Sequence, residues 1–247
     1  MLSIIIFIIF YNFVFGSVTD DFDKQRLSYI DSLSTKLINE NEFTGVSILI
    51  GDNYQTIYNK NFGFGDTENK IFIDDKTIFR IYSMTKPITS VAFMILLERG
   101  LININDPISN YLPEFEEMKK VKVINLPFIK HLFHWTNKVN NPITAFHLLT
   151  HTSGMYYDFT SKYGSVYSKY NKNTYSYKSL LDLDGEHEKI KDISLKEYSE
   201  HMSNLPLLFE PGSDFNYGIN TIILGRLIEV VSGKSLENFI KQEILIP

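Results

Sequence analysis

The chain has 247 residues, and the 44% that are hydrophobic suffice for a core in one large domain or two small ones. Its 24 basic and 29 acidic residues give a formal net charge of −5, and no basic cluster stands out. This balance argues against nucleic acid as a partner and favours a small-molecule or peptide substrate. The chain has no cysteine and can form no disulfide, which neither supports nor excludes export.

Residues 2–15 form an apolar run that is followed by Gly16, Ser17 and several acidic residues. The run is short for a membrane span, and Val14 and Gly16 are small residues of the kind that signal peptidase prefers before a cut. We therefore predict a signal peptide over residues 1–16 and a secreted protein without membrane contact after cleavage. Because no lysine or arginine precedes the run, an uncleaved N-terminal anchor is the alternative.

The next segment predicts a helix and a β-hairpin. Apolar residues recur at helical spacing within residues 23–40, at Leu27, Ile30, Leu33 and Leu37. Residues 45–50 and 54–58 are β-rich and flank a Gly-Asp-Asn turn, which indicates a hairpin. Gly63 and Gly65 lack the third glycine of a dinucleotide-binding fingerprint, and we interpret them as a turn after the hairpin.

Further helices are predicted over residues 84–99, 141–150, 194–204, 222–231 and 235–245. The first should be buried along its apolar positions, which are Ile88, Val91, Ala92, Ile95 and Leu96. Asn141 and Pro142 are typical of a helix start, and Ser194 with Glu197 forms a capping box. Gly100 and Ser232-Gly233 mark two helix ends.

Residues 155–193 predict a tyrosine-rich insertion loop without clear periodicity. Its tyrosines are Tyr156, Tyr157, Tyr163, Tyr167, Tyr170, Tyr175 and Tyr177. A solvated surface loop is the simpler interpretation. A lid over a substrate site is the alternative, since long loops in compact domains often carry function.

Ser83 and Lys86 stand three residues apart where a helix is predicted to begin, so their side chains share one face. A serine hydroxyl is a poor nucleophile until a base takes its proton, and a desolvated lysine amine can be that base. This is the S-x-x-K arrangement of acyl-transfer enzymes. Alone the motif is weak, because roughly one or two chance matches are expected per chain. A helix start with a solvated lysine is the alternative.

The surrounding sequence gives the motif a context. Matching segments are residues 61–66, 75–80, 100–115 and 148–154. In that order they resemble the serine β-lactamase family, in particular its class C-like branch, which also contains esterases and D-alanyl-D-alanine peptidases. The resemblance runs from about Thr44 to Pro247. It implies an α+β, β-lactamase/transpeptidase-like fold, with a helical subdomain and an N-terminal helix and hairpin that belong to an antiparallel sheet.

The same resemblance implies the roles of the site residues. Ser83 is the expected nucleophile, Lys86 the base, and Tyr217 the residue that exchanges a proton with the nucleophile and the leaving group. A core aromatic packed under its loop is the alternative for Tyr217. Where the family has Asn two residues after this tyrosine, the chain has Ile219, and the asparagine follows at 220. Asn220 is therefore a weak substrate-binding candidate, and esterase-like members match better than β-lactamases.

Two features of the family pattern have no counterpart in these residues. The third motif, a Lys or His followed by a small residue and Gly, is missing, because Gly233-Lys234-Ser235 has the wrong order. The C-terminal strands of the family's sheet are missing too. We therefore expect residues 17–247 to be an incomplete β-lactamase-like domain, the front part of a longer protein. Losing the oxyanion-hole donor of the third motif would cost about a hundred- to a thousandfold in rate.

His151 invites a Ser/His/Asp triad, but the chain has no G-x-S-x-G elbow, so we interpret His151 as part of a structural turn. The other histidines lack metal-ligand spacing, and we expect no metal and no cofactor. The predicted function is a serine hydrolase that acts through an acyl-enzyme on ester, amide or β-lactam carbonyls. The alternative is a catalytically inactive, truncated relative that serves as a binding or interaction protein. The sequence indicates no oligomeric state.

Overall fold

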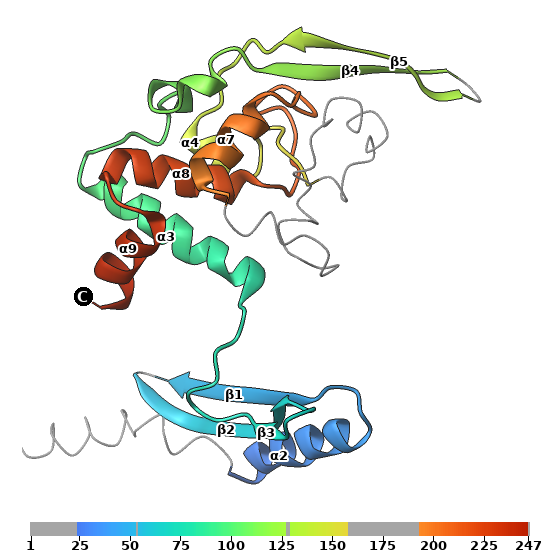
Figure 1. Cartoon of the computed structure of the whole chain (residues 1–247), viewed down its shortest axis with the longest axis vertical. Helices are drawn as coiled ribbons and strands as arrows, with labels where there is room; N and C mark the ends of the chain where they lie inside the picture. The colour runs from blue at the N-terminus through green and yellow to red at the C-terminus, as the bar shows by residue number, and fades with distance from the viewer. Residues whose placement is uncertain (1–23, 53, 127–128, 158–192, 247) are drawn as a thin grey trace, which may run out of the picture. The chain divides into compact units, whose positions relative to one another are not determined.

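The computed structural model describes residues 24–52, 54–126, 129–157 and 193–246, and the chain divides into two compact units between Arg80 and Ile81 (Figure 1). The predicted signal peptide, residues 1–16, lies outside the described residues. The predicted insertion, residues 155–193, does so for all but four of its positions. Within the described part, no helix is both long and apolar enough to cross a membrane.

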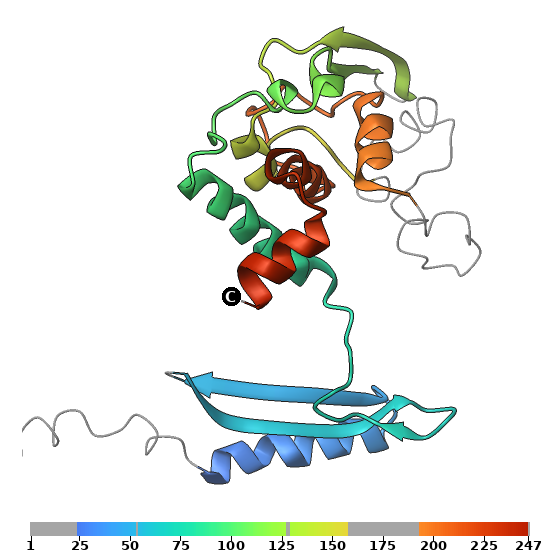
Figure 2. The ribbon, with the colours of Figure 1, turned by 60° about the vertical axis from the view of Figure 1, so that its left-hand side comes forward.

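The first unit is a helix on a small antiparallel sheet. Its elements are α2 (Lys24–Asn39), β1 (Gly45–Asp52), β2 (Gln55–Asp66) and β3 (Ile71–Phe72), with strand order β1-β2-β3. Helix α2 runs along one face of this sheet (Figure 2). The buried Tyr58 of β2 donates a hydrogen bond to Asp31 of α2 at 2.5 Å, and Lys60 forms an ion pair with the same carboxylate at 2.6 Å. The predicted helix and hairpin are therefore confirmed.

The two glycines predicted as a turn lie inside β2 instead. Gly63 pairs with Gly45 of β1 and has a φ of +73°. A Cβ on Gly63 would lie 2.3 Å from the carbonyl oxygen of Thr44 and 2.8 Å from the Cα of Gly45. Glycine is needed here because two strands approach closely and the backbone is left-handed, not because the chain reverses. The prediction of a turn at 63–65 is wrong.

The second unit is mainly helical. Its helices are α3 (Thr85–Glu98), α4 (Ala145–Leu149), α7 (Leu195–Ser203), α8 (Asn220–Ser232) and α9 (Leu236–Ile240), and a π-helical turn follows at Lys241–Leu245. Short 3-10 turns span Tyr82–Met84, Ile108–Asn110 and Pro113–Phe115. Helix α8 packs against α3, α4, α7 and α9, and so forms the centre of the unit. The fully buried Phe93 and Leu96 of α3 belong to the same core as Ile223 and Leu227 of α8.

Most helix ends follow their local signals. Gly100 and Gly233 have φ values of +67° and +68° after α3 and α8, as expected for left-handed helix stops. The Ser194–Glu197 capping box is present at the start of α7. The buried stripe of α3 differs in one respect, because Val91 is 49% exposed while Phe93, which the pattern did not include, is fully buried.

The middle of the chain differs from the sequence analysis at one predicted element and one element that was not predicted. Helix α4 begins at Ala145 rather than at Asn141, and Thr144 forms a capping box with His147. The cause is tertiary: Ile143 accepts a backbone hydrogen bond from Ile108 at 2.8 Å, which keeps residues 143–144 extended. The antiparallel hairpin of β4 (Lys119–Leu126) and β5 (Ile129–Lys138) was not predicted.

Candidate active site

The start of α3 brings Ser83 and Lys86 together. Ser83 lies in the 3-10 turn that precedes α3, and Lys86 lies in the first turn of the helix. The Nζ of Lys86 donates a hydrogen bond to the Oγ of Ser83 at 3.2 Å. Pro87 is tolerated because backbone amides of the first helical turn have few partners within the helix. The backbone itself thus sets the serine beside the lysine.

Tyr217 reaches the same serine from the loop before α8. Its hydroxyl donates a hydrogen bond to the Oγ of Ser83 at 2.8 Å, across 134 positions of the chain. Packing of α3 against α8 makes this contact possible, since each helix carries one part of the site at its N-terminal end. Ser83, Lys86 and Tyr217, the three catalytic candidates from the sequence, therefore form one cluster within the second unit.

Two aromatic rings surround the lysine. The Nζ of Lys86 lies 4.9 Å from the ring centroid of Tyr217 and 5.7 Å from that of Tyr157. Both distances fall within the range of cation–π attraction, which stabilises a positive charge on the amine. The two tyrosine rings also contact each other, with centroids 5.7 Å apart.

The surroundings of Tyr217 favour its ionised form. Burial alone would raise the pKa of this phenol, but hydrogen bonds with Lys86 and Ser83 and the positive charge of Lys86 outweigh it. The pKa of Tyr217 is consequently lower than the usual value of about 10. Tyr217 can therefore give up and regain a proton more readily than an ordinary tyrosine.

Asn220 lies behind Tyr217, and its side chain is completely buried. Its Oδ1 accepts a hydrogen bond from Ser153, and its Nδ2 lies 2.9 Å from the Nδ1 of His151. Both ends of the amide are thus used inside the protein. The side chain of Asn220 therefore has no exposed atom in this structure, and the substrate-binding role expected from the sequence stays a prediction.

His151 is closer to the cluster than the sequence indicated. Its imidazole packs on the ring of Tyr217, with centroids 4.8 Å apart and an interplanar angle of 36°. The His-Thr-Ser-Gly turn does form, but the side chain of His151 also contacts the site. The local pattern could not show this, because the contact joins positions 66 residues apart. The one available signal was the displaced asparagine at 220, which the structure pairs with His151.

Backbone strain also marks the site. Tyr82, directly before Ser83, has a φ of +45°, and His151 has a φ of +56°. Residues with a side chain seldom adopt this conformation, and such strain gathers at functional sites, where the surrounding structure enforces it. Both residues are adjacent to, or in contact with, a member of the Ser83 cluster.

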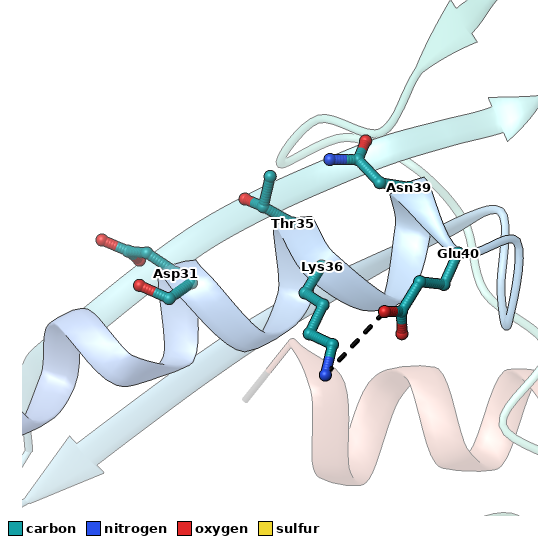
Figure 3. A pocket seen from close by; sticks show the side chains of 6 residues that line it. Asp31, Thr35, Lys36, Asn39 and Glu40 are labelled. Carbon is teal, nitrogen blue, oxygen red and sulfur yellow. Dashed lines mark ion pairs between the residues drawn. The ribbon is translucent and has the colours of Figure 1, made fainter.

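Two other features of the described residues carry less chemistry than the Ser83 cluster. Among residues 24–52, 54–126, 129–157 and 193–246, no group of three histidine or carboxylate side chains could hold a metal ion. A shallow hollow on the surface of α2 is lined by Asp31, Ser32, Thr35, Lys36, Asn39 and Glu40 (Figure 3). Its Lys36 and Glu40 form an exposed ion pair at 3.8 Å, one helical turn apart. Such a pair is typical of a solvated helix face.

Known proteins resemble this chain in sequence and in structure. Esterase EstB of Burkholderia gladioli is 27% identical over 207 residues, which cover 84% of this chain and 46% of EstB. Protein flp of Staphylococcus aureus (strain NCTC 8325 / PS 47) is 28% identical over 93% of this chain and 38% of its own length. The structure of EstCE1, a hydrolase with promiscuous acyltransferase activity, is similar with a TM-score of 0.67 and 25% identity, over 88% of this chain and 50% of EstCE1.

The chain therefore spans half or less of the length of these relatives. A family model described as Beta-lactamase matches residues 30–247, which is most of the chain and includes both units. The match confirms the α+β, β-lactamase/transpeptidase-like fold expected from the sequence. The chain belongs to the Beta-lactamase family.

Proposed function

We propose that the protein is a serine hydrolase that cleaves carboxylic esters through an acyl-enzyme on Ser83. The observation that carries this proposal is the Oγ of Ser83, which accepts hydrogen bonds from both Lys86 and Tyr217. A hydroxyl held between a cation and a proton-exchanging phenol is equipped to become a nucleophile. Amides and β-lactams are related carbonyl substrates for the same attack.

Tyr217 is the stronger candidate for the group that takes the proton of Ser83. Its oxygen is closer to the serine than Lys86 is, at 2.8 Å against 3.2 Å, and its pKa is lowered. Two aromatic faces stabilise the positive charge on Lys86. We therefore assign Lys86 to holding the phenolate of Tyr217 ionised and Tyr217 to moving the proton, which refines the expectation that lysine is the base.

The reaction balances with these groups alone. In the reactive state Tyr217 is ionised, so its hydrogen bond with Ser83 is reversed and the hydroxyl of Ser83 is the donor. The Oγ of Ser83 bonds to the carbonyl carbon while its proton passes to this phenolate. The bond to the leaving alkoxide then breaks, and Tyr217 returns the proton to that oxygen as an alcohol leaves. In the second half a water molecule attacks the acyl carbon while Tyr217 takes one of its protons. The bond between the Oγ of Ser83 and the acyl carbon then breaks, Tyr217 returns the proton to Ser83, and the carboxylic acid leaves. If an alcohol replaces water, the acyl group is transferred instead.

The relatives support an ester as the first substrate to test. EstB is named an esterase, and EstCE1 is described as a hydrolase with promiscuous acyltransferase activity. We extend to this chain only the shared chemistry, attack on the carbonyl of a small molecule. A signal peptide over residues 1–16 would make the enzyme a secreted one, and this location is part of the same proposal.

The test has two parts. The intact chain is incubated with a fluorophosphonate and its mass is measured to detect a covalent adduct, and, in a separate assay on unlabelled protein, the rate of p-nitrophenyl acetate hydrolysis is measured. We expect one adduct on the wild type and none on Ser83→Ala. Ser32→Ala is the matched control, because Ser32 is exposed on α2 and donates a hydrogen bond to the backbone carbonyl oxygen of Ser28. This control should be labelled like the wild type.

The opposite result has a clear meaning. If folded wild-type protein takes up no label and hydrolyses the ester no faster than Ser83→Ala does, the serine hydrolase proposal fails. The inactive binding protein then becomes the better hypothesis. Circular dichroism of each variant establishes that the comparison is made between folded proteins.

A further inference from the structure

The buried polar groups behind Tyr217 form a directed chain of hydrogen bonds. The amide of Met155 donates to the Oγ of Ser153 at 3.1 Å, so the hydroxyl proton of Ser153 is left to donate to the Oδ1 of Asn220. This fixes the amide orientation of Asn220 and turns its Nδ2 toward His151. Ser153 and Asn220 are both completely buried, so bulk solvent does not reach these groups.

The chain of bonds ends on one nitrogen of His151. Its Nδ1 lies 2.9 Å from the Nδ2 of Asn220 and 3.4 Å from the backbone nitrogen of Gly218. Both partners are donors, so the Nδ1 must be an acceptor and the ring proton must be on Nε2. The arrangement therefore selects a single neutral tautomer of His151.

The backbone of the segment that contains His151 is hydrogen-bonded to the segment that carries Tyr217. The backbone carbonyl of His151 accepts a hydrogen bond from the amide of Asn216 at 2.9 Å, and the Nδ2 of Asn216 donates to the carbonyl of Met155 at 3.1 Å. A Cβ on Gly218 would lie 2.7 Å from the oxygen of Met155, which shows how closely the two segments approach. The imidazole is thus held in place where it packs against the ring of Tyr217.

The electrostatic environment of His151 also favours a neutral imidazole. Burial, and secondarily the positive charge of Lys86, hold the pKa of His151 below its usual value of about 6.5. Within the described residues, the titratable groups that interact with the imidazole are Lys86 of α3 and Tyr217 of the loop before α8. A proton on Nδ1 would remove the acceptor for Asn220 and Gly218 and place a second cation beside Lys86.

We propose that His151, locked as a neutral imidazole by Asn220, is a positioning residue that orients Tyr217 toward Ser83. The inference rests on the proposed function and gives the histidine a role other than a triad base. Asn220, expected from the sequence to bind substrate, acts in this scheme through His151.

The first test observes the ring directly and needs no activity. Nitrogen-15 NMR of the intact chain should show His151, assigned by the His151→Gln variant among the six histidines, protonated only on Nε2 at neutral pH. Asn220→Asp should raise the pKa of His151, because a carboxylate at that place accepts a proton from Nδ1. Asn220→Leu should remove the ring-to-ring NOE between His151 and Tyr217. The matched control is Asn238→Asp, which adds the same charge at an exposed position on α9.

The second test measures catalysis of p-nitrophenyl acetate hydrolysis. Asn220→Leu should lower kcat about 10- to 100-fold with little change in KM, the pattern of a misplaced catalytic group. His151→Phe, which keeps a ring but loses the acceptor, should behave similarly. In Asn220→Asp the pH below which kcat/KM falls should rise. It should rise together with the midpoint of the His151 titration that NMR measures.

Two results would overturn the inference. One is an Asn220→Leu protein that keeps the wild-type tautomer, NOE and kcat. The other is an Asn220→Asp protein in which the NMR titration midpoint of His151 rises while the pH at which kcat/KM falls stays unchanged. Absence of any labelling at Ser83 would instead count against the proposed function, and the tautomer and NOE measurements would still decide the orientation of Tyr217.

Discussion

At the scale of single residues, the site depends on the positions of three atoms, which are the Oγ of Ser83, the Nζ of Lys86 and the hydroxyl oxygen of Tyr217. Ser83 and Lys86 could be predicted from the sequence because one helical turn joins them. Tyr217 could be proposed only through a family motif, since nothing local connects it with Ser83. The contact of His151 with Tyr217 could not be predicted from the sequence, because it depends on how the segments 151–157 and 216–220 pack.

Removing a single oxygen atom tests the role of Tyr217. In Tyr217→Phe the ring packing against His151 and Lys86 remains, but the hydrogen bond to Ser83 is lost. We expect kcat for ester hydrolysis to fall about 100- to 10,000-fold, the usual contribution of a positioned acid or base. The thermal midpoint should change little, because Tyr217 is 39% exposed.

The matched control for this change is Tyr29→Phe, which deletes the same atom from a side chain that is 73% exposed on α2. Its kinetics should equal those of the wild type. Full activity in Tyr217→Phe would remove the tyrosine from the mechanism and return the role of base to Lys86.

At the scale of elements, the sequence predicts what local chemistry decides. Helices α2, α3, α7 and α8 follow from apolar periodicity, caps and glycine stops, all of which act within a few residues. The start of α4 was misplaced because a hydrogen bond from Ile108 to Ile143 overrides the Asn-Pro signal. Gly63 was misinterpreted for a similar reason, since its need for glycine comes from Thr44 across the hairpin.

The turn that carries His151 gives an element-scale prediction. Gly154 and Gly233 both have left-handed φ values, +86° and +68°. A Cβ on Gly154 would lie 2.7 Å from the carbonyl oxygen of Phe209, whereas a Cβ on Gly233 would meet nothing within 4 Å. We expect Gly233→Ala to cost about 1 kcal/mol of unfolding free energy, from the φ value alone. Gly154→Ala should cost about 3 kcal/mol, because the backbone must also move.

Urea unfolding followed by circular dichroism measures both values, and each variant is the control for the other. Gly154→Ala should also slow labelling of Ser83, because the displaced turn carries His151 and Ser153. Equal losses of stability in the two variants would show that the crowding at Gly154 is relieved without cost.

At the scale of the whole molecule, carboxylates on several elements are stabilised in their charged form. The pKa values of Asp31, Asp66, Glu197, Glu210 and Glu243 are all lower than usual. A carboxylate whose pKa is depressed by folding stabilises the folded state above its unfolded pKa, near 4, and loses that contribution as the pH falls through its folded pKa. The stability of the chain should therefore decline below about pH 4.

Glu210 is the most informative of these groups, because it joins separate parts of the second unit. It forms an ion pair with Lys120 of β4 and accepts hydrogen bonds from the backbone amides of Asn140 and Asn141. Burial opposes its ionisation, but the contacts with Lys120 and the two amides outweigh it and lower its pKa. Its side chain is only 15% exposed, so solvent screens these contacts little.

Glu210→Gln should therefore lower the unfolding free energy by about 1 to 2 kcal/mol at neutral pH, since the charge-assisted bonds weaken while an amide oxygen remains as acceptor. The difference from the wild type should shrink as the pH falls from 7 toward 3, because the wild-type carboxyl becomes protonated and resembles the amide. Urea unfolding midpoints of both proteins between pH 7 and pH 3 measure this difference in stability. Glu116→Gln is the control, because Glu116 is exposed. A difference that stays constant down to pH 3 would mean that Glu210 stabilises the fold by packing and neutral hydrogen bonds rather than by its charge.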